Sequence, residues 1–139
     1  MDITHVEDKL AVTKQISAED IATIASKGYA AIINNRPDGE KGDYITAAEA
    51  EALAQENGLH YLHIPVNPMQ LTEEAITAFR HALENLAGPI VAHCGSGRRS
   101  SIMWALSRAG HFDADEILHR CASAGHDLSA LRPRLETSG

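Results

Sequence analysis

Residues 90–100 read Ile-Val-Ala-His-Cys-Gly-Ser-Gly-Arg-Arg-Ser. Residues 90–93 are a short apolar run that follows the breaker Gly88-Pro89, and this pattern predicts a buried strand. The segment from about Ser100 to Ala109 carries apolar side chains at helical spacing, so a helix is expected there. Cys94 therefore follows the end of a strand and is separated from a helix only by a glycine-rich loop. A strand, a tight loop and a helix in this order are typical of α/β proteins.

The rest of the chain alternates strand and helix signals in the same way. Ser17 with Asp20, and Thr46 with Glu49, have the spacing of capping boxes, so a helix is expected to begin after each pair. The predicted strands are residues 3–6, 10–13, 29–33, 60–66 and 90–93; further helices are expected over about 72–86 and from the Asp113 cap to 123, with a final turn over about 128–135. This order predicts an α/β fold with a central, mainly parallel sheet of four to five strands, helices on both faces and an N-terminal β-hairpin.

Composition limits the class of protein. A chain of 139 residues with 44% hydrophobic content fits one core, so a single domain over residues 1–139 is expected. The formal net charge of −7 argues against nucleic acid and anionic membranes as general partners. The start of the chain has no leader pattern, no run is long enough to cross a bilayer, and only two cysteines occur, so we expect a cytoplasmic protein with reduced thiols. The eight histidines lack metal-ligand spacing, so neither a metal nor another cofactor is expected. The oligomeric state stays open.

The loop after residue 93 has the features of an oxyanion-binding cradle. We expect backbone N–H groups to converge here with the positive end of the following helix dipole, namely those of Gly95, Ser96 and Gly97. The glycines allow the loop to curl tightly. This field stabilises the thiolate of Cys94. The other cysteine, at position 121, lies mid-helix without such surroundings, and we expect it to be structural.

The residues next to the glycines complete the predicted site. Arg99 is expected to hold two oxygens of a tetrahedral anion with its planar fork, and Arg98 adds charge, although a one-residue slip of the loop would exchange the two arginines. Ser100 is expected to hydrogen-bond the sulfur. His93 ends a buried strand, so we give it a supporting role in bracing the loop.

At these residues the chain resembles known families. His93-Cys94 and Arg99-Ser100, strung between a strand and a helix, resemble the signature loop of cysteine-dependent protein tyrosine phosphatases, but only four residues separate cysteine from arginine here instead of five. The shorter spacing resembles the active loop of rhodanese-type sulfurtransferases. Together with residues 34–40 and 63–66, the loop resembles the bacterial phosphatase-like domain of beta-lactamase hydrolase-like proteins. This resemblance implies a protein tyrosine phosphatase-like fold, and activities of either kind. In that family a basic residue often follows the cysteine directly, where this chain has Gly95.

The loop at residues 34–43 leaves a second strand at the same edge of the predicted sheet, where open α/β sheets bind ligands. Asp38 or Glu40 in this loop could act as a proton donor, and Arg36 could hold substrate. Such a donor would be needed because residues 67–72, where the phosphatases usually place a general-acid Asp, contain no acid.

Three functions follow from these features. The first is a phosphatase-like hydrolase that forms a phosphocysteine on Cys94 and acts on a small oxyanion or a phosphorylated substrate. The second is a sulfurtransferase that takes sulfane sulfur from thiosulfate or a persulfide. The third is an anion or persulfide sensor without turnover. Resemblance places the phosphatase slightly ahead, whereas the four-residue spacing favours sulfur transfer.

Overall fold

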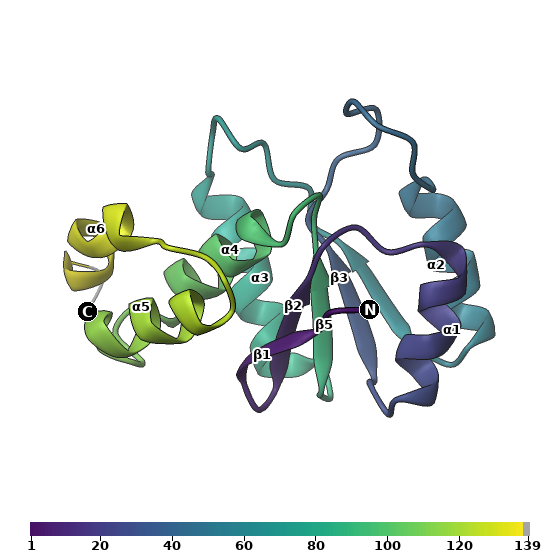
Figure 1. Ribbon diagram of the computed structural model, residues 1–139, viewed down its shortest axis with the longest axis horizontal. Coiled ribbons are helices and arrows are strands. Elements are labelled where there is room, and N and C mark those ends of the chain that lie inside the picture. The colour runs from purple at the N-terminus through teal and green to yellow at the C-terminus, as the bar shows by residue number, and fades with distance from the viewer. Residues whose placement is uncertain (138–139) are drawn as a thin grey trace.

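A computed structural model describes residues 1–137 of the chain. Its centre is a five-stranded sheet with the order β1-β2-β5-β3-β4 (Figure 1). The strands are β1 (Thr4–Glu7), β2 (Leu10–Thr13), β3 (Ala31–Asn34), β4 (His60–His63) and β5 (Ile90–His93). β1 and β2 form the predicted antiparallel hairpin at one side of the sheet, and all other pairs of neighbouring strands are parallel. The mainly parallel sheet with its hairpin confirms the predicted fold class.

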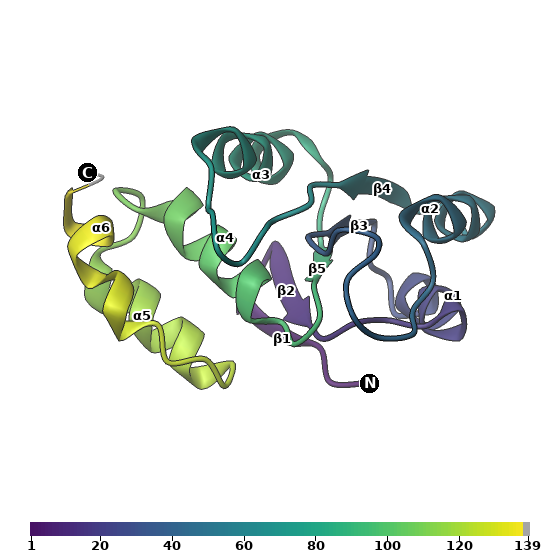
Figure 2. The ribbon, with the colours of Figure 1, turned by 90° about the horizontal axis from the view of Figure 1, so that it is seen from above.

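Helices cover both faces of the sheet, as Figure 2 shows from above. The helices are α1 (Ala18–Ser26), α2 (Ala47–Glu56), α3 (Glu73–Asn85), α4 (Arg98–Arg108), α5 (Ala114–Ser123) and α6 (Arg132–Thr137), with a 3-10 turn at Ser129–Leu131. α1 and α2 pack on one face around Ile32 and Val91, and the other helices form a larger core on the opposite face, around Trp104 and Phe79. None of the helices in the described part of the chain is long and apolar enough to cross a membrane.

Local sequence signals set most of these bounds. The two predicted capping boxes, Ser17 with Asp20 and Thr46 with Glu49, are both present. β4 ends at His63, three residues earlier than predicted, although the N–H groups of Ile64 and Val66 still donate to the carbonyl oxygens of Asn34 and Asn35.

α4 begins at Arg98, two residues earlier than predicted. Gly97 acts as its N-cap with a φ of 95°, a conformation that glycine adopts readily, so the chain turns into the helix at once. The loop between β5 and α4 is therefore short.

The parallel strands end in register at one edge of the sheet. Thr13, His93 and Asn34 are direct neighbours on β2, β5 and β3, and His63 lies next to Asn34 on β4. The segments that follow these strands consequently meet above this edge, and Cys94 lies in the middle of them.

Candidate active site

The loop from Cys94 to Gly97 curls around the cysteine sulfur. The Gly97 N–H donates to Cys94 Sγ at 3.1 Å, and the Cys94 side chain is completely buried. A Cβ at Gly97 would lie 3.3 Å from both the Thr13 carbonyl oxygen and His126 Nε2, so the loop passes tightly between these groups. Ser96 is exposed, and its hydroxyl accepts a hydrogen bond from the N–H of Arg98 at 3.3 Å, which satisfies one free donor of the first turn of α4.

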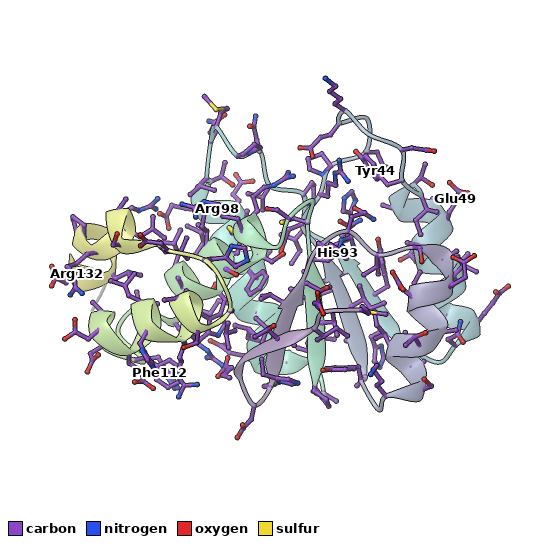
Figure 3. All side chains as sticks on the ribbon, viewed as in Figure 1. Tyr44, Glu49, His93, Arg98, Phe112 and Arg132 are labelled. Atoms are coloured by element: carbon purple, nitrogen blue, oxygen red, sulfur yellow. The ribbon has the colours of Figure 1, made fainter. Side chains whose placement is uncertain are left out.

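The two arginines of the loop point to different places. Arg99 lies on the inner side, where its side chain is 14% exposed and Nη1 donates to the Val66 carbonyl oxygen at 3.0 Å. Arg98 is exposed and donates to the Asp127 carbonyl oxygen at 3.2 Å (Figure 3). Of the two, Arg99 is therefore the arginine that the loop places beside Cys94, and hydrogen bonds with Glu40 together with the charge of Cys94 raise its pKa.

Glu40 joins the loop at residues 35–46 to the cysteine loop. Its carboxylate accepts from Arg99 Nη1 at 2.8 Å and Nη2 at 2.9 Å, and its Oε1 also accepts from Arg36 Nε at 3.2 Å. Arg36 is held in turn by Gln15 Oε1 at 3.3 Å and by the ring of Tyr44, whose centroid lies 3.6 Å from the guanidinium carbon. Figure 3 marks the position of Tyr44 above the edge of the sheet.

The two carboxylates of this loop that the sequence offers as proton donors, Asp38 and Glu40, are engaged with other groups in this structure. Hydrogen bonds from Arg99, and then from Arg36, hold the pKa of Glu40 below its ordinary value, so it is ionised at neutral pH. Asp38 Oδ1 accepts from the N–H of Ala47 at 2.9 Å, in the first turn of α2. In this structure Asp38 is thus a helix-terminal acceptor and Glu40 an ion-pair partner, and the role of either as a proton donor stays a prediction.

Ser100 also has a different partner from the predicted one. Its hydroxyl donates to Asn35 Oδ1 at 2.8 Å, and both residues are fully buried. Asn35 donates through Nδ2 to the Ile64 carbonyl oxygen and through its backbone N–H to the His93 carbonyl oxygen. This network fastens β3, β5 and α4 together beneath the loop. The expected hydrogen bond from Ser100 to sulfur is replaced by this structural one.

His93 lies under the loop, in the position where the sequence predicted a bracing residue. Burial lowers its pKa to about 4, so the ring is neutral at physiological pH. Nδ1 lies 3.5 Å from the Cys94 carbonyl oxygen, and Nε2 has no hydrogen-bond partner among the described residues. Cys121 is buried in the larger core, where burial raises the pKa of its thiol to about 12.

Sequence reasoning missed Gln15 and Tyr44, two of the residues that hold Arg36. Gln15 follows β2 at the edge where Cys94 lies, and its backbone N–H donates to the Gly95 carbonyl oxygen at 3.1 Å. Its position after a parallel strand was the available signal. Tyr44 accepts from the Glu40 N–H and donates to the Pro37 carbonyl oxygen, contacts within one loop that no periodic pattern reveals.

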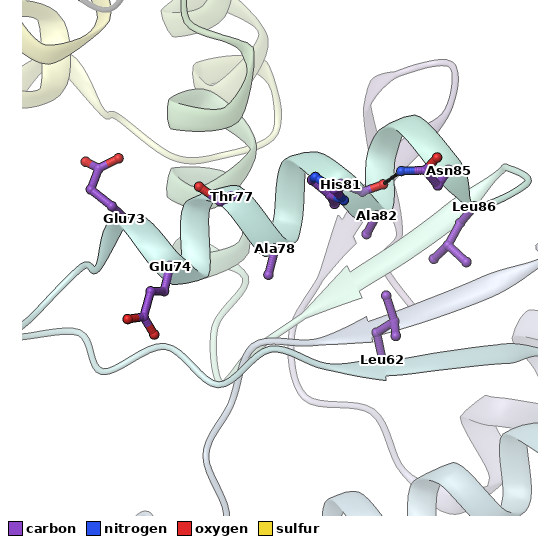
Figure 4. A pocket seen from close by; sticks show the side chains of 9 residues that line it. All are labelled: Leu62, Glu73, Glu74, Thr77, Ala78, His81, Ala82, Asn85 and Leu86. Carbon is purple, nitrogen blue, oxygen red and sulfur yellow. Dashed lines mark hydrogen bonds between the residues drawn. The ribbon is translucent and has the colours of Figure 1, made fainter.

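An apolar groove elsewhere in the structure lacks the chemistry of this loop. An apolar groove of about 720 Å³ runs between α3 and β4, lined by Leu62, Ala78 and Leu86 among others (Figure 4). It contains no cysteine and no arginine.

Within residues 1–137, no group of three or more His, Cys, Asp or Glu residues is arranged to hold a metal ion.

The sequence is similar to that of known proteins. The family model described as "Beta-lactamase hydrolase-like protein, phosphatase-like domain" matches residues 2–111. A beta-lactamase hydrolase-like protein of Xylella fastidiosa (strain Temecula1) is 34% identical over 130 residues, which are 92% of this chain and 30% of that protein. The chain spans 30% to 32% of the length of the curated relatives it matches.

Solved structures share the whole fold. A candidate phosphatase from Neisseria meningitidis Z2491 has a TM-score of 0.87 at 29% identity, covering 100% of this chain and 99% of that one. The core catalytic domain of the PP-IP phosphatase Siw14 from S. cerevisiae, crystallised with citrate, has a TM-score of 0.71 at 16% identity, over 97% of this chain and 83% of that one. The fold is protein tyrosine phosphatase-like.

Proposed function

The chain belongs to the family of phosphatase-like domains of the beta-lactamase hydrolase-like proteins, and on this basis we propose that it is a cysteine-dependent phosphatase with Cys94 as its nucleophile. One observation carries the proposal: the N–H of Gly97 donates to Cys94 Sγ at 3.1 Å. An amide aimed at the sulfur stabilises negative charge there, and the same loop offers its other amides to an incoming oxyanion.

The reaction has two steps. Cys94 Sγ attacks phosphorus, so that a P–S bond forms while the ester P–O bond breaks and the leaving oxygen departs with the bonding electrons. Loop amides and Arg99 stabilise the charge on the equatorial oxygens. Water then attacks the phosphocysteine, the P–S bond breaks, and inorganic phosphate and the thiolate are released.

Substrate must displace side chains before the first step. Cys94 has no exposed surface, and Glu40 occupies the fork of Arg99 with two hydrogen bonds. A phosphoryl group that binds in the loop therefore has to take over the guanidinium from this carboxylate. The segment that carries Glu40 contains Gly39 and Gly42, both with positive φ, and it can rearrange without breaking β3 or α2.

Neither of the two predicted donors, Asp38 and Glu40, is free to protonate the leaving oxygen in this structure. In the described part of the chain, Asp38 and Glu40 are engaged with the backbone of α2 and with two arginines, and residues 67–72 contain no acid. We therefore expect turnover to depend strongly on how readily the leaving group departs as an anion.

Hydrolysis of para-nitrophenyl phosphate tests the proposal. We expect slow turnover by the wild-type protein, none by Cys94→Ser, and unchanged turnover by Cys121→Ser, because Cys121 is buried in the core away from the loop. Equal activity of the wild type and Cys94→Ser would show that another group does the chemistry.

Sulfur transfer is the second candidate, because only four residues separate Cys94 from Arg99. In this reaction the thiolate attacks the outer sulfur of thiosulfate, an S–S bond forms and sulfite leaves; a thiol acceptor then takes the sulfur. Such a transfer needs no acid at residues 67–72. Thiosulfate turnover that is lost in Cys94→Ser, without any phosphatase activity, would replace the phosphatase with this function. Anion binding without either turnover would indicate a sensor.

A further inference from the structure

The carboxylate of Glu40 is bound as a ligand would be, between two guanidinium groups. Arg99 donates to both of its oxygens, at 2.8 and 2.9 Å, and Arg36 Nε donates to Oε1 at 3.2 Å. Oε1 therefore serves two donors, and the bond to Arg36 is the longest of the three. The side chains of Arg36 and Arg99 are only 13% and 14% exposed, so both charges are held in a mostly enclosed place.

Both guanidinium groups also border the cysteine loop. A Cβ built on Gly95 would lie 3.5 Å from Arg99 Nη2 and 3.8 Å from the guanidinium carbon of Arg36. Gly95 directly follows Cys94, and because it has no side chain, the space between its backbone and the Arg36 guanidinium stays free of a side chain at position 95. The orientation of Arg36 is fixed by Gln15, by the Lys41 carbonyl oxygen at 2.9 Å and by the ring of Tyr44.

We propose that the Glu40 carboxylate marks a second anion subsite, formed by Arg36 and Arg99 beside the loop around Cys94, and that the substrates carry a second phosphoryl group close to the one that is cleaved. This inference rests on the proposed phosphatase function. Diphosphates and closely spaced bisphosphates are the corresponding chemical class. A second phosphoryl group offers two or three non-bridging oxygens in place of the two carboxylate oxygens of Glu40, so it can replace Glu40 at Arg36 Nε and at one Nη of Arg99 while the other Nη contacts the group that is cleaved.

Arg99 would bind both phosphoryl groups. It contacts Glu40 directly, and its Nη2 lies 3.5 Å from the position of a Cβ on Gly95, the residue after Cys94, so it lies between the two positions. Arg36 would contact only the second group, which makes it the residue that distinguishes substrates with two phosphoryl groups from substrates with one.

Calorimetric titration with two non-hydrolysable probes, methylenediphosphonate and methylphosphonate, tests the subsite. We expect the wild-type protein to bind methylenediphosphonate at least about tenfold more tightly, since one guanidinium–phosphoryl contact is worth about a factor of ten or more. Arg36→Gln should reduce this ratio to about threefold or less. Lys41→Gln is the matched control, because it removes a positive charge from the exposed part of the same loop and should keep the ratio.

A second variant keeps the test decisive if Arg36→Gln does not fold. Glu40→Gln removes the competing carboxylate charge, so methylenediphosphonate should bind several-fold more tightly than to the wild type. Equal affinities of the two probes for the wild type, or weaker binding of methylenediphosphonate by Glu40→Gln, would overturn the inference. Hydrolysis of para-nitrophenyl phosphate on the same samples separates the two proposals, because turnover without a diphosphonate preference refutes the subsite alone.

Discussion

Replacing the two neighbouring arginines of the loop one at a time separates a functional guanidinium from a peripheral one. Arg99 donates with both Nη atoms to one carboxylate, at 2.8 and 2.9 Å, and this is the geometry in which it would hold two phosphoryl oxygens. Lysine keeps the charge but cannot span two oxygens with a planar fork. Arg98 is exposed, and its side chain donates at 3.2 Å to a backbone oxygen, that of Asp127.

The expected magnitudes follow from these contacts. A hydrogen bond between charged groups contributes about 1.5–3 kcal/mol, so the loss of one of two bonds to the transition state in Arg99→Lys should cost about 2 kcal/mol. This corresponds to a decrease in kcat/KM of about 30-fold. For Arg98→Lys we expect a change of about threefold or less, as for exposed ion contacts in general.

Steady-state hydrolysis of para-nitrophenyl phosphate by the two variants and the wild type measures both values, with circular dichroism as a check on folding. Equal losses, or a larger loss in Arg98→Lys, would refute the assignment of Arg99 and would mean that the loop binds its substrate in a register shifted by one residue.

Three further predictions concern the groups around the loop. Alkyl phosphates should be hydrolysed at least about 100-fold more slowly than para-nitrophenyl phosphate for lack of a proton donor, and Asn67→Asp should improve the alkyl substrates selectively; comparable wild-type rates for both classes would mean that a donor exists elsewhere. Ser100→Ala leaves the buried Asn35 Oδ1 without its 2.8 Å donor, so urea titration should show a loss of about 1–3 kcal/mol in the free energy of unfolding. An unchanged free energy of unfolding together with lost turnover would instead indicate that Ser100 acts directly at the sulfur. The pKa of His93 is lowered to about 4 in the folded protein, so the unfolded chain binds a proton at this histidine first as pH falls. The free energy of unfolding should therefore decrease by about 3 kcal/mol between pH 6.5 and pH 4. An equal decrease in His93→Gln would show that His93 is not the cause.

Local patterns account for what the sequence could predict. The capping boxes after Ser17 and Thr46, and the loop after Cys94, involve residues within a few positions of one another, so spacing alone identifies them. Glu40 and Arg99 lie 59 positions apart, and Asn35 and Ser100 lie 65 positions apart. Their pairing depends on how closely the segments after β3 and β5 approach each other, which no periodic pattern encodes.

For this reason the residue types of the site were identified better than their partners. Arg36, Asp38 and Glu40 are candidates because they follow a strand at the ligand-binding edge, and Ser100 because it ends the cysteine loop of the sequence. Which of them contacts sulfur, backbone or another charge depends on side-chain geometry across the edge. The ion pair between Glu40 and two arginines satisfies three charged groups at once, and the separate sequence positions of these residues do not reveal it.

In the proposed reaction Cys94 forms a covalent bond to phosphorus, and the intact mass of the protein is the direct test of this step. Wild-type protein is incubated with para-nitrophenyl phosphate, quenched rapidly and compared with samples treated with thiosulfate and with Cys94→Ser. We expect a gain of one phosphoryl group on Cys94 with the aryl phosphate, and no adduct in the variant. A gain of one sulfur atom from thiosulfate, with no phosphoryl adduct under any condition of quenching, would contradict it and would assign Cys94 to sulfur transfer.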